Sequence, residues 1–369
     1  MTSLTHSATN DRSLLPGERP FALLGAGGEL TGRTDFPMPS PEELVALYRA
    51  MVIGRRFDSQ ATALTKQGRL AVYPSSRGQE ACQVGVVHAM RNQDWLFPTY
   101  RDSVALVTRG VHPVDVLCLL RGDWHCGYDP YERRVAPQCT PLATNTLHAV
   151  GLAHAATLKH EDVVAVVLLG DGATSEGDTH EALNFAAVWN APVVFLIQNN
   201  GYAISVPSAR QTVAPSLAHK GIGYGIASVQ VDGNDPAAVF ATVRSAVEAA
   251  AAGGGPTLIE ALTYRVGAHT NADDATKYRQ PEEVEAWLVR DPITRLELYL
   301  QSEHLIDETD TAELEAEAEA LAAALRLALN DDADLNPADL FAHVYVTPTA
   351  MLAAQQQALQ AELSEPEGE

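Results

Sequence analysis

Two oxygen-bearing side chains stand just after two apolar runs in the middle of the chain. Asp171 follows the run at 163–169, within the sequence GDG, and Asn200 comes shortly after the run at 192–197, within NNG. A carboxylate oxygen and an amide oxygen are hard ligands of the kind that Mg²⁺ takes together with waters and phosphate oxygens. The glycines on both sides of Asp171 let the main chain come close to an anionic ligand. We therefore expect a site for magnesium and a phosphate-bearing ligand.

The spacing of these two side chains suits elements that bring them together. Both apolar runs lack polar alternation, which is typical of strands buried on both faces of a parallel sheet, and residues 178–189 between them show a helical pattern. The separation of 29 positions (200 − 171) fits a strand end, a turn, a helix and a second strand. Parallel strands joined in this way end at one edge of the sheet, where open α/β sheets bind ligands. The free N–H groups at the start of the helix, near Asp178, would favour an anion there.

The pattern continues toward the C-terminus, with strands expected over 227–231 and 257–263 and a helix over 235–252. The predicted fold class is therefore α/β: a doubly wound parallel sheet with helices on both faces, followed by a C-terminal helical segment. Two other phosphate-binding motifs are missing from the sequence. No G-K-[ST] of a P-loop occurs, and the glycines of GAGGE at 25–29 follow no strand, as a dinucleotide-binding fingerprint requires.

Composition divides the chain into three parts. Residues 1–38 are rich in Ser, Thr, Gly and Pro and predict an extended N-terminal arm. Residues 39–300 form the ligand-binding domain, which opens on a helix with Ser40 as N-cap and Glu43 completing a capping box. Residues 301–369 form an acidic C-terminal helical region, where the density of alanine and glutamate predicts a solvated helix without chemistry.

Charge and cysteine usage exclude several classes of protein. The formal net charge is −22 and the cations are scattered, so nucleic acid is not an expected partner. No apolar run approaches the roughly 18–20 residues that span a bilayer, so a membrane is not expected either. The cysteines lack C-x-x-C spacing and the N-terminus has no basic segment followed by an apolar one, which favours unpaired thiols in a reducing cytoplasm. These cysteines are Cys82, Cys118, Cys126 and Cys139.

Six motifs within residues 40–300 resemble, in order, the α-subunit of the branched-chain 2-oxo acid dehydrogenases, which depend on thiamine diphosphate. The α-subunits of pyruvate and acetoin dehydrogenases are more distant relatives with the same layout. The motifs are FPTYRDS at 97–103, PLATN at 141–145, GDGATSEGD at 170–178, NNGYAIS at 199–205, VDGND at 231–235 and TYRVGAHTNADDATKYR at 263–279.

This resemblance implies roles for individual residues. Asp171, Asn200 and the main-chain oxygen of Tyr202 would hold magnesium. His269 occupies the position of the family's catalytic histidine, and imidazole titrates near neutrality, so it can donate or accept a proton. The guanidinium of Arg101 suits a diphosphate. The residues implied to contact the cofactor are Tyr100, Arg101, Thr140, Leu142, Gly170, Asp171, Gly172, Ala173, Asn200 and His269, and a potassium ion in some relatives would fall near Pro141, Thr144 and Asn145.

Two segments depart from the family's pattern. The stretch RGDWHCGYD at 121–129 is shorter and more acidic than its counterpart, with His125 as the candidate for that stretch's histidine. Gln198 stands two residues before Asn200, where relatives often carry an arginine that helps to neutralise the diphosphate. Either change would weaken cofactor binding unless other residues compensate.

The resemblance also implies that one chain holds half of an active site. The glutamate that activates the cofactor comes from a second domain of similar fold, and only acidic helix follows residue 300. We therefore expect a β-subunit, an α2β2 heterotetramer, and transfer of the acyl group to the lipoyl group of an acyltransferase component. Branched 2-oxo acids are the favoured substrates, with a pyruvate or acetoin enzyme as the alternative. A catalytically silent scaffold subunit is the alternative from another class, and the intact Asp171, Asn200, Arg101 and His269 argue against it.

Overall fold

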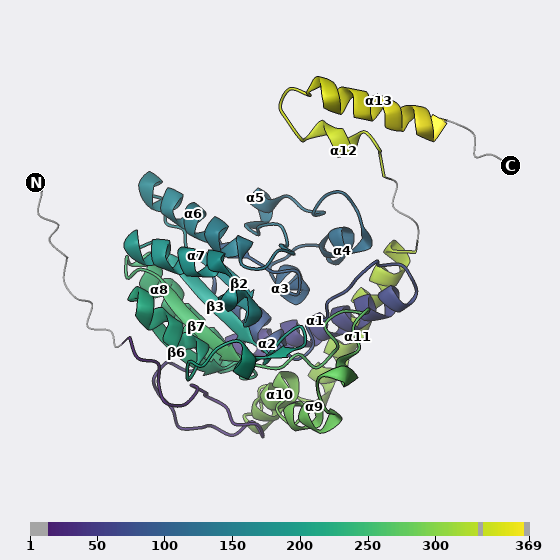
Figure 1. The fold of residues 1–369 in the computed structure, drawn as a ribbon. Coiled ribbons are helices and arrows are strands. Elements are labelled where there is room, and N and C mark those ends of the chain that lie inside the picture. Colours follow the sequence, from purple (N-terminus) through teal and green to yellow (C-terminus); the bar gives the residue numbers. More distant parts are fainter. Residues whose placement is uncertain (1–13, 331–334, 365–369) are drawn as a thin grey trace, which may run out of the picture.

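The computed structural model describes residues 14–330 and 335–364, and its body is built on a five-stranded parallel sheet (Figure 1). The strands lie in the order β1-β2-β3-β7-β6, and each neighbouring pair is parallel. The predicted α/β class with a parallel sheet is therefore confirmed. The strands are β1 (Trp95–Phe97), β2 (Ala165–Gly170), β3 (Val193–Asn199), β6 (Ala227–Asp232) and β7 (Thr257–Leu262), and a short antiparallel pair is formed by β4 (Tyr202–Ala203) and β5 (Val206–Pro207).

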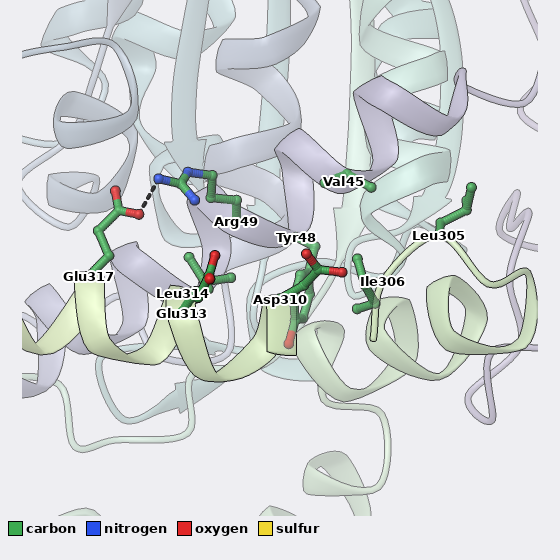
Figure 2. A pocket seen from close by; sticks show the side chains of 9 residues that line it. All are labelled: Val45, Tyr48, Arg49, Leu305, Ile306, Asp310, Glu313, Leu314 and Glu317. Carbon is green, nitrogen blue, oxygen red and sulfur yellow. Dashed lines mark hydrogen bonds and ion pairs between the residues drawn. The ribbon is translucent and has the colours of Figure 1, made fainter. Parts of the chain in front are cut away.

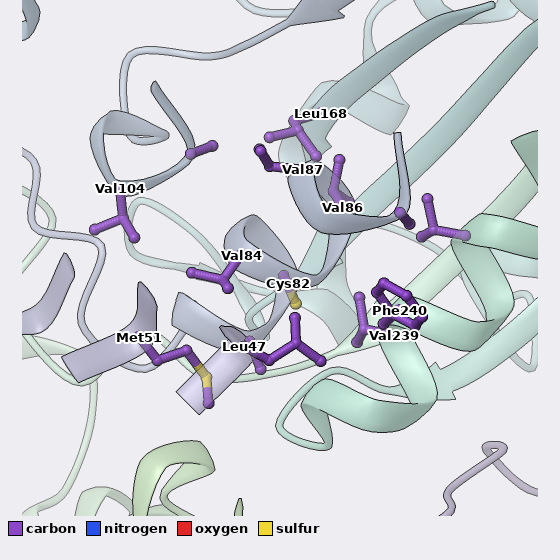
Figure 3. Close-up of a cluster of buried hydrophobic side chains, with 14 of the residues drawn as sticks. Leu47, Met51, Cys82, Val84, Val86, Val87, Val104, Leu168, Val239 and Phe240 are labelled. Atoms are coloured by element: carbon purple, nitrogen blue, oxygen red, sulfur yellow. The ribbon is translucent and has the colours of Figure 1, made fainter. Parts of the chain in front are cut away.

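Helices cover both faces of the sheet, as predicted. Because successive side chains of a strand point to opposite faces, Val166 and Leu168 of β2 join one core, while Val167 and Leu169 join the other. Figure 3 shows the first core, in which side chains of α1, α2 and α8 pack together near Leu168. The second core lies under α6 and α7. The helices are α1 (Pro41–Lys66), α2 (Glu80–Ala89), α3 (Ser103–Thr108), α4 (Pro113–Arg121), α5 (Pro130–Arg133), α6 (Thr144–Lys159), α7 (Gly177–Val188), α8 (Pro236–Ala251), α9 (Pro281–Leu288), α10 (Pro292–Ser302), α11 (Glu308–Ala328), α12 (Asp339–Ala342) and α13 (Ala350–Ser364).

The first helix begins where the sequence predicted. Ser40 is its N-cap, and the Ser40 side chain accepts a hydrogen bond from the main-chain N–H of Glu43 at 3.2 Å. The Glu43 carboxylate in turn accepts from the main-chain N–H of Ser40 at 2.8 Å. The predicted capping box is therefore confirmed.

The described part of the N-terminal segment, residues 14–38, packs against the sheet. Phe21 pairs with the edge strand β6: its N–H donates to the Gln230 carbonyl and its carbonyl accepts from Asp232, both at 2.8 Å. The main-chain N–H groups of Leu23 and Leu24 both donate to Oδ2 of Asp235 at 2.7 Å. The segment therefore covers one edge of the sheet, and edge strands are commonly protected in this way.

The acidic helix α11 is not the solvated helix that its composition predicted. It buries the stripe Leu314, Ala318, Ala322 and Leu325, whose spacing of three or four residues places them on one face, against α1. The alanine content of the segment indicates only that it forms a helix. The spacing of the alanines places some of them on one face, which packs against α1. By contrast, α13 has no buried residue and lies apart from the body in Figure 1.

A cavity of about 420 Å³ lies between α1 and the beginning of α11 (Figure 2). Tyr48 and Leu314 line it, and Arg49 forms an ion pair with Glu317 at one end. None of the residues predicted to bind a cofactor lies on its wall. Within residues 14–330 and 335–364, no helix combines the length and the apolar character needed to cross a membrane.

Asp235 joins the N-terminal segment to α8, because Oδ1 of its carboxylate caps α8 by accepting from Ala237 and Ala238 at 3.1 Å while Oδ2 holds the segment. We expect Asp235→Ala to lower the free energy of unfolding by about 2–4 kcal/mol. Asp235→Asn keeps a capping oxygen and should lose less. Urea denaturation followed by circular dichroism measures both, and equal stability of Asp235→Ala and the unsubstituted chain would contradict this role.

Candidate cofactor site

A second cavity, of about 470 Å³, opens where β2 and β3 end, as parallel sheets lead one to expect. The register pairs Gly170 with Gln198 across these strands, so the residues that follow each strand emerge side by side. Every residue predicted to contact the cofactor or the metal lies on the wall of this cavity. They are Tyr100, Arg101, Thr140, Leu142, Gly170, Asp171, Gly172, Ala173, Asn200, Tyr202 and His269.

The GDG turn and the NNGYAIS loop approach each other closely at the cavity. A Cβ atom added to Gly172 would lie only 2.8 Å from Cβ of Ala203, so this position requires glycine. A 3-10 helix over Gly172–Ser175, which the sequence did not predict, follows Asp171 directly, and α7 begins after it at Gly177. The main chain of this turn therefore reaches the cavity wall, as an anion-binding turn must.

The two side chains predicted to bind the metal are buried, with 2% of Asp171 and 6% of Asn200 exposed. Asn200 Nδ2 donates to Oε1 of Gln79, and Asn200 Oδ1 accepts from the N–H of Tyr202, both at 3.1 Å. Oδ2 of Asp171 accepts from Nε2 of Gln211 at 2.8 Å. Burial raises the pKa of Asp171, and this hydrogen bond opposes the rise. A cation beside this carboxylate would therefore be stabilised there.

Two guanidinium groups face one nitrogen of His269. Arg101 Nη2 lies 3.0 Å and Arg265 Nη1 lies 3.1 Å from His269 Nδ1. Guanidinium groups only donate, so Nδ1 must accept and the ring proton of the neutral imidazole resides on Nε2. Burial and, after it, the charges of Arg101 and Arg265 lower the pKa of His269 to about 4. The sequence does not show two cations on one side of the ring, so this lowering of the pKa of His269 could not be foreseen from the motif.

The loop that carries His269 is tied down by its own side chains. Oδ2 of Asp273 accepts from the main-chain N–H of His269 at 2.7 Å and from the hydroxyl of Tyr278. The Arg279 guanidinium donates to main-chain oxygens of residues 265–267. These contacts fix the side of the loop that faces the cavity.

Comparison with known proteins identifies the family. The sequence model of the family described as "Dehydrogenase E1 component" matches residues 48–330. This chain belongs to the dehydrogenase E1 component family. It is 47% identical, over 346 residues and 94% of each chain, to the 3-methyl-2-oxobutanoate dehydrogenase subunit alpha of Mycobacterium tuberculosis. It is 37% identical, over 313 residues and 84% of each chain, to the pyruvate dehydrogenase E1 component subunit alpha of Staphylococcus aureus. The resemblance stated from the motifs is confirmed.

Several residues on the cavity wall of this E1 chain were not predicted from the sequence. Gln79 and Arg265 are the most consequential, because Gln79 contacts Asn200 and Arg265 contacts His269. Gln211, which does not line the cavity, was not predicted either, and it contacts Asp171. Arg265 stands inside the motif TYRVGAH, which could have drawn attention to it, whereas no motif surrounds either glutamine.

The structure also shows where the residues that depart from the E1 pattern lie. Gln198 lies on the cavity wall, donates to Oδ1 of Asp102 at 2.7 Å and accepts from Nε2 of Gln79 at 3.0 Å. His125 does not line the cavity; its Nδ1 accepts from the N–H of Gly127 within its own loop. The substituted side chain at 198 is thus part of a buried network of amides, whereas the histidine candidate remains outside the site.

The three residues that were expected near a potassium ion lie outside the cavity lining. Thr144 and Asn145 begin α6, and Nδ2 of Asn145 donates to the carbonyl oxygens of Phe97, Pro98 and Leu168, the last at 2.8 Å. The Pro141 carbonyl accepts from Sγ of Cys139. In this arrangement Asn145 ties the ends of β1 and β2 together.

The tautomer and low pKa of His269 can be tested by NMR of the chain labelled with ¹³C-histidine. The Cε1–Hε1 signal that disappears in His269→Gln should titrate near pH 4. In Arg265→Met, which removes one of the two cations, the pKa should rise toward the unperturbed value of about 6.5. Arg265→Lys keeps the cation and is the matched control. A titration near pH 6.5 in the unsubstituted chain would contradict the assignment.

Proposed function

We propose that this chain is the α-subunit of a dehydrogenase that oxidatively decarboxylates branched-chain 2-oxo acids and passes the acyl group to a lipoyl group. The observation that carries the proposal is the convergence of the predicted metal ligands, Arg101 and His269 on one cavity. The substrate class rests on the relative that is 47% identical over 94% of its length, because the pyruvate dehydrogenase relative is only 37% identical over 84%.

Members of this family use thiamine diphosphate, and the donor set of the cavity fits that cofactor with magnesium. Asp171 would supply a carboxylate oxygen, Asn200 an amide oxygen and Tyr202 its main-chain oxygen, which are the hard ligands that Mg²⁺ takes beside phosphate oxygens. The 3-10 turn that begins at Gly172 would present main-chain N–H groups to the diphosphate. When bound, the cofactor supplies the electron sink for loss of carbon dioxide.

Two arginines provide the positive charge of the site. Arg101 is positioned by its donation to the main-chain oxygen of Ser75 at 3.0 Å, and Arg265 by its donation to Ile204 and Tyr278. A diphosphate and a substrate carboxylate are both anionic, so each arginine would be stabilised by them. Arg265 is the residue of this chain that would compensate for the neutral Gln198, because it places a buried guanidinium on the same cavity wall.

His269 would act as a hydrogen-bond donor. With Nδ1 accepting from two guanidinium groups, its proton is held on Nε2, and the low pKa keeps the ring neutral at physiological pH. A neutral imidazole N–H can donate a hydrogen bond that stabilises negative charge developing on a substrate oxygen. His269 is therefore suited to hold the carbonyl oxygen of the 2-oxo acid.

The second half of the site would come from a β-subunit. The carboxylates on the described cavity wall are Asp171, assigned to the metal, and Glu176, the exposed N-cap of α7. Neither is free and buried as the glutamate that activates the cofactor must be. Apolar side chains at the mouth of the cavity, including Leu142 with 41% and Ile204 with 53% exposed, would be covered by the partner. An α2β2 heterotetramer is the assembly we propose, and the four free cysteines suit a cytoplasmic location.

The test is a panel of 2-oxo acids with an artificial electron acceptor, run on the chain co-expressed with its β-subunit. We expect kcat/KM for 3-methyl-2-oxobutanoate to exceed that for pyruvate by about 10- to 200-fold or more, since the pocket must distinguish an isopropyl group from a methyl group, which is two carbons smaller. The α-chain alone should be inactive. A preference for pyruvate would overturn the substrate class, and turnover by the α-chain alone would overturn the shared site.

A further inference from the structure

Gln211 contacts the metal-ligand candidate Asp171 from a different loop. It follows the 3-10 turn Ser208–Arg210, and its Nε2 lies 2.8 Å from Oδ2 of Asp171 and 3.0 Å from the carbonyl oxygen of Val206. One amide nitrogen therefore joins the carboxylate to the main chain of the β4–β5 segment. The side chain is half-buried, and nothing in the proposed cofactor chemistry requires it to touch the cofactor.

This hydrogen bond makes the two oxygens of Asp171 unequal. Oδ2 is engaged by Gln211, and in the described part of the chain no cation forms an ion pair with this carboxylate. An ion that takes both oxygens of a carboxylate must lie between them, at similar distances from each. Oδ2 keeps a second lone pair, as Oδ1 of Asn200 does beside the N–H of Tyr202, so the hydrogen bond from Gln211 does not close Oδ2 to a cation but makes Oδ1 the more available of the two oxygens.

The second metal-ligand candidate is held in a similar way. Nδ2 of Asn200 is engaged by Oε1 of Gln79, so the amide cannot rotate by half a turn without losing that contact. Its Oδ1 already faces the N–H of Tyr202. Two glutamines thus orient the two side chains from outside the metal position, and groups of this kind tune a metal site without touching the metal.

Restricting a carboxylate to one oxygen matters most for the choice between two common cations. Mg²⁺ demands octahedral geometry and takes carboxylates through single oxygens, whereas Ca²⁺ accepts six to eight oxygens and readily takes both oxygens of one carboxylate. A site in which one oxygen of Asp171 is more available than the other therefore favours Mg²⁺, which needs only one, over Ca²⁺.

We propose that Gln211 is a specificity-determining residue that favours magnesium over calcium by holding Asp171 to coordination through one oxygen. The inference rests on the proposed function, since it takes Asp171 as a ligand of the cofactor's metal. Gln79 acts as a positioning residue for Asn200 in the same site. Both act on the ligands, so their effects appear in metal preference and not only in turnover.

The experiment is calorimetric titration of thiamine diphosphate into the complex of this chain with its β-subunit, in saturating MgCl₂ or CaCl₂. The quantity compared is the ratio of the two dissociation constants, Kd with calcium over Kd with magnesium. In Gln211→Met, which keeps the side-chain length but cannot donate, the ratio should fall about 10- to 150-fold, the size of one lost hydrogen bond to a charged group. Gln211→Ala should do the same and serves if the methionine packs poorly.

Gln230→Met is the matched control. Nε2 of Gln230 donates to the Glu260 carboxylate at 3.1 Å, so the substitution removes the same kind of amide-to-carboxylate contact from a carboxylate that lies outside the cavity lining. Its calcium-to-magnesium ratio should equal that of the unsubstituted complex. An equal fall in the control would show a general effect of lost contacts and would overturn the inference.

The remaining outcomes separate the inference from the proposed function. If both Gln211 variants bind the cofactor with an unchanged ratio, Gln211 does not select the metal, although the cofactor site stands. If the unsubstituted complex binds no thiamine diphosphate with either metal, the proposed function itself fails, and the inference fails with it.

Discussion

The parallel pairing of β2 with β3 is the constraint on which the rest of the site depends. Its register sets Gly170 opposite Gln198, which brings the GDG turn beside the NNGYAIS loop. The glycine at 172 then lets the two segments come within contact distance near Ala203. A shift of this register would separate Asp171 from Asn200, because each follows the end of one of these two strands. The flanking helices and the edge-covering N-terminal segment stabilise the sheet that holds this register.

In the chain without a ligand, cationic side chains lie close to one another in the site. Arg101 and Arg265 both approach His269, and burial lowers the pKa of Arg265 as well as that of His269. The Nε atom of Arg265 has no hydrogen-bond partner among the described residues. Buried carboxylates and guanidiniums of this kind are commonly found at functional sites, where a ligand supplies the missing opposite charge. The cavity is thus arranged for an anion and a cation together, as a metal diphosphate would provide.

Much of the fold and of the site could be predicted, because both follow from local patterns. Apolar runs marked the strands, and residues fixed to strand ends, such as Asp171 and Asn200, needed only the sheet to bring them together. Gln79 and Gln211 could not be predicted, because each contacts its partner side chain, Asn200 or Asp171, from a loop distant in sequence. Neither glutamine lies in a recognisable motif. The pKa of His269 depends on the positions of two guanidinium groups in the folded chain, and the spacing of residues in the sequence does not show these positions. For α11, the acidic composition indicated a solvated helix, whereas the spacing of its alanines would have indicated a buried face.

We propose that Asp171 and Asn200 anchor a metal-bound diphosphate at the ends of β2 and β3. An experimental structure of the complex with its β-subunit, crystallised with thiamine diphosphate and magnesium, tests it most directly. We predict magnesium in contact with Asp171, with Oδ1 of Asn200 and with the main-chain oxygen of Tyr202, and with oxygens of the diphosphate bound to the same ion. A diphosphate bound elsewhere, or in this cavity without contact to Asp171 and Asn200, would contradict it.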